Sequence, residues 1–161
     1  MTDTPATDPT GSDPTGSDPS PSRPPRFNHV AMSVDRDLLS PQGRAELLDF
    51  YGEVFGWTEA PGMSRDGEQL VFLCHRHDQF VFLLGTDDPM RAPRMDHFGQ
   101  SVQTRGELDA LHRRAAGGAG TNDRVDVIDP VVDEFPGLAL HAFYVGFLLP
   151  LMVETQYWEW T

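Results

Sequence analysis

Two nine-residue segments of this chain are identical at four positions and similar at a fifth, and this internal repeat restricts the fold more than any other feature of the sequence. Residues 26–34 read Arg-Phe-Asn-His-Val-Ala-Met-Ser-Val, and residues 94–102 read Arg-Met-Asp-His-Phe-Gly-Gln-Ser-Val. His29 and His97 therefore occupy equivalent positions, 68 residues apart (97 − 29). Each segment has the length and alternation of a β-strand and precedes a candidate helix, so we expect two copies of one structural unit.

The elements predicted after each repeat segment follow the same order. In the first unit, a helix over 41–55 begins at Ser40-Pro41 and ends at Gly56, and in the second a capping box at 104–107 begins a helix that Gly117 ends. The predicted strands cover 27–34, 57–60, 69–74 and 80–84 in the first unit, then 95–102, 124–132, 138–145 and 149–158 in the second. Both halves read βαβββ, which predicts an α+β domain with a curved mixed sheet and a cleft.

The first 25 residues differ in kind from the rest. They contain the sequence Thr-Gly-Ser-Asp-Pro twice, at 10–14 and 15–19, and are poor in large apolar side chains, so we expect a disordered, low-complexity tail without the features of a secretory signal. Residues 26–161 are then expected to form one domain, with the first repeat at about 26–90 and the second at about 94–160.

Charge and composition exclude several classes of function. The formal net charge is −13 and the chain has no lysine, which argues against nucleic acids, anionic membranes, lysine Schiff bases and phosphate-binding P-loops. No apolar run approaches the ~20 residues that cross a bilayer, and a single cysteine excludes an internal disulfide. We therefore expect a soluble, cytoplasmic protein that acts on a small molecule.

The repeat segments and two further motifs resemble the vicinal oxygen chelate superfamily, which includes glyoxalase I, extradiol dioxygenases, fosfomycin-resistance enzymes and bleomycin-resistance proteins. The similarity covers roughly residues 26–160. The further motifs are Leu-Leu-Asp-Phe-Tyr-Gly-Glu-Val-Phe-Gly-Trp at 47–57 and Pro-Leu-Met-Val-Glu-Thr-Gln at 150–156. The resemblance implies a divalent metal held by a histidine from the first strand of each unit and a glutamate from the last strand, here His29, His97 and Glu154.

The residue types are consistent with that implication. Two imidazoles and one carboxylate suit Fe, Mn, Ni, Co or Zn and leave positions open for water or substrate. Glu154 lies in the apolar run 149–155, where a buried charge needs a compensating group, and a metal ion is one such group. A solvated glutamate and two structural histidines are the alternative interpretation.

Two residues on the preceding strand are candidates for acid–base catalysis. Dioxygenases of the superfamily use a histidine and a tyrosine around the metal, which implies roles for His141 and Tyr144, although His141 equally suits a half-buried structural position. The fourth ligand that glyoxalase-type members carry on the last strand of the first unit has no counterpart in 80–84, and Gln79 is the nearest candidate. A three-ligand site favours dioxygenase or fosfomycin-transferase geometry, and the acidic chain disfavours the transferase.

Three functions remain open at this point. The first is a metal-dependent enzyme, a dioxygenase or a lyase or isomerase, whose substrate chelates the ion through adjacent oxygens. The second is a non-catalytic protein that binds a drug or metabolite, favouring cations, in a cleft with aromatic walls. The third is a regulatory or structural relative without activity. A homodimer is expected, and the cleft is formed either within one chain or between two copies; the apolar turn at 145–150 is a candidate for lining a pocket or a dimer contact.

Overall fold

The computed structural model describes residues 24–161, and they form two βαβββ units as the sequence predicts. The tail predicted for residues 1–25 lies outside the described residues except for its last two, which are exposed. The first unit consists of β1 (His29–Asp35), the 3-10 helix η1 (Arg36–Leu39), α1 (Pro41–Phe55), β2 (Thr58–Glu59), β3 (Gln69–Leu73) and β4 (Phe80–Thr86). The second consists of β5 (His97–Ser101), α2 (Arg105–Ala119), β6 (Asp126–Phe135), β7 (Leu138–Gly146) and β8 (Met152–Trp160).

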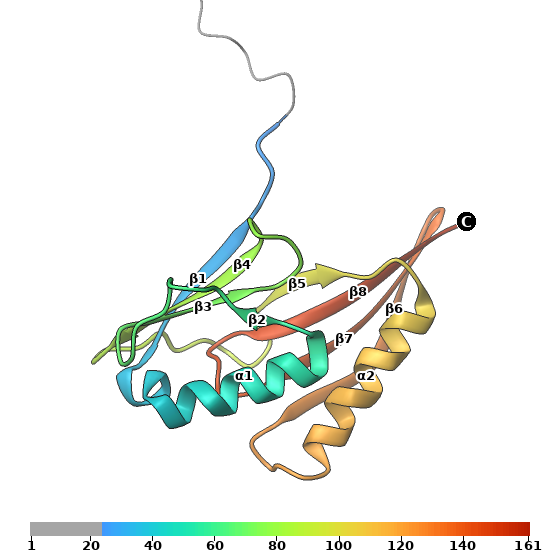
Figure 1. Cartoon of the computed structure of the whole chain (residues 1–161). Coiled ribbons are helices and arrows are strands. Elements are labelled where there is room, and N and C mark those ends of the chain that lie inside the picture. The colour runs from blue at the N-terminus through green and yellow to red at the C-terminus, as the bar shows by residue number, and fades with distance from the viewer. Residues whose placement is uncertain (1–23) are drawn as a thin grey trace, which may run out of the picture.

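Each unit folds its four strands into one mixed sheet, and the two sheets have the same topology. The strand orders are β1-β4-β3-β2 and β5-β8-β7-β6. In each sheet the first strand pairs in parallel with the last, and the remaining pairs are antiparallel. Figure 1 shows α1 and α2 side by side on one side of both sheets. The opposite side, which we call the open face, carries no helix.

The helix ends follow from local sequence. Ser40 accepts a hydrogen bond from the amide of Gly43 at the start of α1, and Gly56 ends the helix in the left-handed conformation with φ 74°. Thr104 and Glu107 form the predicted capping box of α2. The predicted end of α2 at Gly117 was wrong, because the glycines there keep negative φ and the helix continues to Ala119.

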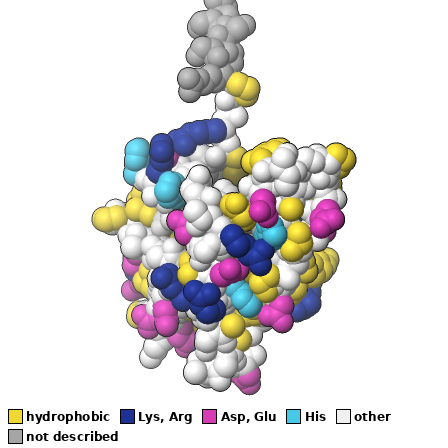
Figure 2. Space-filling view, turned by 90° about the vertical axis from the view of Figure 1, so that its right-hand side faces the viewer, with side chains coloured by type: hydrophobic (Ala, Val, Ile, Leu, Met, Phe, Trp, Pro, Cys, Tyr) yellow, Lys and Arg dark blue, Asp and Glu magenta, His cyan; other side chains and the backbone are white. Residues whose placement is uncertain are grey.

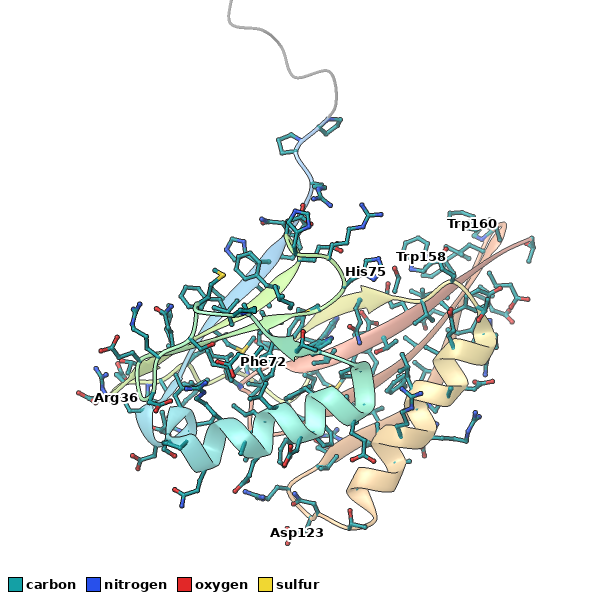
Figure 3. The ribbon with its side chains drawn as sticks, in the orientation of Figure 1. Arg36, Phe72, His75, Asp123, Trp158 and Trp160 are labelled. Carbon is teal, nitrogen blue, oxygen red and sulfur yellow. The ribbon has the colours of Figure 1, made fainter. Side chains whose placement is uncertain are left out.

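One hydrophobic core joins the two units. The buried ring of Tyr51 in α1 lies 5.0 Å from Trp57 and 5.8 Å from Phe72, and its hydroxyl donates a 2.9 Å hydrogen bond to the carbonyl of Phe147 in the second unit. Trp57 also stacks near Phe98 of β5 at 6.3 Å. Figure 3 places Phe72 between its sheet and α1. The shared core fixes the position of each sheet relative to the other.

The apolar turn at 145–150 contributes to this core. Phe147 is buried and packs against Phe50 of α1 at 4.5 Å, while Leu148 adopts φ 59° to make the turn. Leu149 and Pro150 line a shallow groove beside α1. The turn therefore packs chiefly against the first unit of its own chain.

Candidate metal centre

His97 and Glu154 meet on the open face of the second sheet because of strand register. β5 and β8 are parallel neighbours, and Gly99 is the register partner of Glu154. Strand alternation turns His97 and Gly99 to the same face as Glu154, whereas Phe98 and Val153 point into the core. The Nε2 atom of His97 lies 3.5 Å from Oε2 of Glu154.

The hydrogen bond on the other side of the His97 ring fixes its tautomer. Nδ1 lies 2.7 Å from the carbonyl oxygen of Met95, which can only accept, so Nδ1 carries the hydrogen. In the neutral ring, Nε2 then presents a lone pair towards Glu154. The 3.5 Å distance between Nε2 of His97 and Oε2 of Glu154 is too long for a charge-assisted hydrogen bond. It does match the spacing of two metal ligands: atoms that each lie about 2.0–2.2 Å from one ion are about 3–3.5 Å from each other. The pair has the geometry of two adjacent ligands.

Glu154 is buried and held from both sides. Its side chain is 8% exposed, Oε1 accepts a 2.7 Å hydrogen bond from the Tyr144 hydroxyl, and Oε2 accepts a 2.6 Å bond from Nε2 of Gln156. Neither partner is a cation, so these bonds orient the carboxylate without neutralising its charge. A divalent ion beside His97 would supply that neutralisation, and the donor set suits such an ion.

Tyr144 belongs to this site as a hydrogen-bond donor. Its ring lies 5.1 Å from that of His97 in an edge-on arrangement. Burial, followed by the hydrogen bond to the Glu154 carboxylate, raises the pKa of Tyr144 to about 12. The hydroxyl therefore keeps its hydrogen at neutral pH and is available as an acid or an orienting donor, not as a resting base.

His141 lies on the other side of the same sheet. It is three residues before Tyr144 on β7, so alternation turns it towards α2. It is buried, its Nε2 donates a 2.7 Å hydrogen bond to Oε2 of Glu159, its Nδ1 contacts Arg105, and its ring stacks on Tyr157 at 5.8 Å. The structure does not bring His141 to Glu154, and its contacts are those of a structural residue.

His29 occupies the equivalent position in the first unit. Its Nδ1 is bonded to Oδ1 of Asn28 at 2.8 Å, which leaves Nε2 free, and its ring stacks on Phe80 at 4.7 Å. Within residues 24–161, however, the structure contains no group of three or more His, Cys, Asp or Glu side chains that could hold a metal ion. His29 is thus not joined to His97 and Glu154 within the single chain.

A cleft between the units connects these regions. It has a volume of about 750 Å³; His29 and Phe80 line it from the first unit, and Gly99, Gln156 and Trp158 line it from the second. Cys74 also lines the cleft, but burial raises the pKa of its thiol to about 12, which makes it a poor nucleophile. The cleft brings His29 to the neighbours of Glu154 but not to Glu154 itself.

The repeat also shows that the first unit has no carboxylate at the position of Glu154. Ala31 of β1 pairs with Phe82 of β4 as Gly99 pairs with Glu154, so Phe82 stands at the position of the carboxylate. Gln79, the one nearby candidate, precedes β4 and lines the cleft. Of the two hydrogen-bond partners of Glu154, the sequence analysis had named Tyr144 but missed Gln156, which no sequence pattern marked.

Comparison with known proteins identifies the fold. No protein-family model matches the chain, and no curated protein resembles it in sequence at a significant level. Among solved structures, a lactoylglutathione lyase from Agrobacterium tumefaciens is similar with a TM-score of 0.55 and 20% identity, covering 83% of this chain and 93% of that one. A glyoxalase/bleomycin resistance protein/dioxygenase from Alicyclobacillus acidocaldarius is similar with a TM-score of 0.57 and 18% identity, covering 85% of this chain and 94% of that one.

A third similar structure carries ligands. It is a mutant of the fosfomycin resistance protein FosX from Listeria monocytogenes in complex with Mn(II) and 1S,2S-dihydroxypropylphosphonic acid, with a TM-score of 0.56 and 15% identity over 81% of this chain and 87% of that one. These similarities confirm the predicted α+β fold of two βαβββ units, which is that of the vicinal oxygen chelate superfamily. At these identities they establish the fold alone.

Proposed function

With the vicinal oxygen chelate fold as the premise, we propose that this protein is a divalent-metal-dependent enzyme acting on a small substrate that binds the ion through adjacent oxygens. The observation that carries the proposal is the pair formed by Nε2 of His97 and Oε2 of Glu154, 3.5 Å apart and both free to donate a lone pair. A bound ion such as Fe, Mn, Ni, Co or Zn would act as a Lewis acid towards the substrate oxygens.

The chain's own residues supply orientation and a proton donor. Tyr144 holds Oε1 of Glu154, and its raised pKa keeps it a donor at neutral pH. Glu154 is fixed on a strand at the centre of the sheet, not on a loop, which suits a site that needs defined geometry. In this proposal Tyr144 is the acid–base residue, and His141 stabilises the sheet from the α2 side.

We further propose that the third ligand, His29, comes from a second copy of the chain. On the open face of the first sheet, Leu84 is 41% exposed, and on that of the second, Trp158 and Trp160 are 43% and 72% exposed. Figure 3 shows both tryptophans on the side of the sheet away from the helices. A homodimer that places one copy's first sheet against the other's second sheet would cover these surfaces and bring His29 to the metal.

Charge on the surface agrees with a small-molecule site. In Figure 2, arginine, acidic and histidine side chains are interspersed on the face shown, with hydrophobic side chains between them, and no continuous basic patch appears there. No helix within residues 24–161 is long and apolar enough to cross a membrane. The proposal therefore includes no nucleic-acid or membrane partner.

Metal titration tests the proposed function. Isothermal calorimetry with Mn(II) and Zn(II) should give about one ion bound per chain in the wild type and none in His97→Ala or Glu154→Ala. His112→Ala is a matched control, since His112 also bonds a carboxylate, that of Asp129, but on the α2 side. The proposal would be overturned if the wild type bound no metal ion, or if Glu154→Ala bound it as the wild type does.

Mixed copies test the source of His29. If the site is shared, a dimer of one His29→Ala chain and one Glu154→Ala chain retains one intact site of two, and refolding the two variants together restores metal binding. If the site lies within one chain, every chain in the mixture is defective and nothing is restored. Absence of a dimer in light scattering would also contradict the shared arrangement.

A non-catalytic binding protein is the second candidate. The observation in its favour is the exposed pair of Trp158 and Trp160, whose rings lie 5.9 Å apart and could contact an aromatic or cationic ligand. Such a protein would bind its ligand equally well after treatment with a chelator. The metal-dependent enzyme would lose substrate binding under the same treatment.

A further inference from the structure

The hydrogen bonds around Gln156 form a chain with a fixed direction. The indole nitrogen of Trp158 donates to Oε1 of Gln156 at 2.9 Å, and Nε2 of Gln156 donates to Oε2 of Glu154 at 2.6 Å. An indole N–H can only donate and a carboxylate only accepts, so the amide of Gln156 has one orientation that satisfies both neighbours. Trp158 and Glu154 thus favour the same orientation of the amide.

Strand geometry explains why these three side chains meet. Glu154, Gln156 and Trp158 alternate along β8, so all three lie on the open face in one row. The backbone of Gln156 is held in place as well, since its carbonyl accepts a 2.8 Å hydrogen bond from the amide of Val102. The row is therefore rigid on its strand, and the amide can transmit the position of Trp158 to the carboxylate.

The bond from Gln156 occupies one of the two lone-pair directions of Oε2. The other lone pair of Oε2 is left for an ion beside His97, whose Nε2 lies 3.5 Å from Oε2. On the remaining side Gly99 leaves space, because a Cβ there would stand 3.3 Å from Oε2 and 4.0 Å from Nε2 of Gln156. Oε2 of Glu154 thus has the Gln156 donor on one side and the space left by Gly99 on another.

We propose that Gln156, oriented by Trp158, is a positioning residue that aims Oε2 of Glu154 at the ion held by His97. This inference rests on the proposed metal site and adds to it a residue that is not itself a ligand of the ion. Gln156 acts only through Glu154, in the way that hydrogen-bonded partners of metal ligands commonly tune affinity. Replacing it should weaken metal binding without unfolding the domain.

The test compares Zn(II) affinity with thermal stability in three variants. Gln156→Met keeps the length of the side chain but removes its donor and acceptor, and we expect affinity to fall about tenfold. Trp158→Phe keeps an aromatic ring but removes the indole donor to Oε1 of Gln156, and we expect a smaller fall than in Gln156→Met. Trp160→Phe is the matched control: the rings of Trp160 and Trp158 lie 5.9 Å apart on the same exposed surface, but the structure shows no hydrogen bond from the Trp160 indole nitrogen within residues 24–161. Any loss of affinity through the dimer contact should therefore be similar in both variants, and affinity should fall further in Trp158→Phe.

A readout in the spectrum separates positioning from general destabilisation. Zn(II) should shift the side-chain amide resonances of Gln156 in a ¹H–¹⁵N spectrum of the wild type, and the size of that shift should fall in Trp158→Phe but not in Trp160→Phe. All variants should unfold within a few degrees of the wild type.

The possible failures are distinguishable. If the wild type and Gln156→Met bind Zn(II) equally well, the positioning role is overturned and the proposed function remains intact. Wild-type protein that binds no Zn(II) would overturn both. Equal losses in Trp158→Phe and Trp160→Phe would show that packing of the two rings, not the direction of the amide, controls the site.

Discussion

The two units share a topology but divide their tasks. The first supplies large aromatic side chains to the core, with Tyr51, Trp57 and Phe72 all buried, and its open face has Phe82 where the second unit has Glu154. The second unit has the buried carboxylate and its hydrogen-bond donors. The difference shows that a repeated fold preserves strand register while a single residue difference at one register position decides which copy carries a buried carboxylate.

Removing the carboxylate should have the largest effect. In Glu154→Ala we expect metal affinity to fall by more than about 100-fold, because the one buried acidic side chain within residues 24–161 is lost, and loss of a hydrogen-bond partner of a metal ligand alone costs about 10- to 100-fold. Phe82→Ala changes the equivalent position of the first unit and should leave affinity near that of the wild type. Calorimetry with Mn(II) measures both, and equal losses would remove the distinction between the units.

Removing the donor to Glu154 should have the next largest effect. Tyr144→Phe keeps the ring beside His97 but removes the hydroxyl that bonds Oε1 at 2.7 Å, and we expect metal affinity to fall about tenfold. Tyr157→Phe is a suitable control, since Tyr157 packs on the core side of the same sheet. Unchanged affinity in Tyr144→Phe would show that the hydroxyl does not orient the carboxylate.

The hydrogen bond from Tyr51 to the carbonyl of Phe147, which joins the two units, should make stability depend on pH. Burial raises the pKa of Tyr51 far above its ordinary value, so the folded state keeps the hydroxyl neutral while the unfolded chain ionises above about pH 10. Stability is therefore unaffected by this group below pH 10 and falls above it by about 1.4 kcal/mol per pH unit.

Urea unfolding at pH 8 and pH 11 measures that dependence. Tyr51→Phe should be less stable at pH 8 by about 1 kcal/mol, because the hydrogen bond to the Phe147 carbonyl is lost, and should show a smaller decrease at pH 11. The same decrease in the variant and the wild type would mean that Tyr51 does not control the loss at high pH.

The smallest effect concerns the space beside the carboxylate. Gly99→Ala would place a methyl group 3.3 Å from Oε2 of Glu154, and we expect a cost of about 1 kcal/mol, or about fivefold in metal affinity. The reverse change at the equivalent position, Ala31→Gly, should leave affinity unchanged, because Phe82 is its register partner. Equal effects at both positions would contradict the assignment of the site to the second unit.

The sequence predicted the fold well because its signals were local or repeated. The helix predicted over 41–55 is α1, and the capping box at Thr104 and Glu107 begins α2. The end of α2 was misplaced because Gly117 and Gly118 keep helical, negative φ values and the helix continues to Ala119, and whether a glycine leaves the helical conformation depends on packing beyond the sequence window.

The site was less predictable because it depends on contacts between strands. Alternation allowed Glu154 to face either side of β8, and the structure turns it to the open face beside His97. The same alternation separates His141 from Tyr144, which the sequence had grouped together. The direction of the Gln156 amide depends on hydrogen bonds to two other side chains, which no sequence pattern specifies.

A crystal structure of the protein soaked in Mn(II), with anomalous data collected near the manganese edge, is the most direct test of the central claim. We expect an anomalous peak about 2.0–2.3 Å from both Nε2 of His97 and Oε2 of Glu154, with Tyr144 still bonded to Oε1. The third protein ligand in that map would be His29 from a second copy. A peak only at another place, or no peak after soaking at saturating Mn(II), would contradict the assignment of this pair as the metal centre.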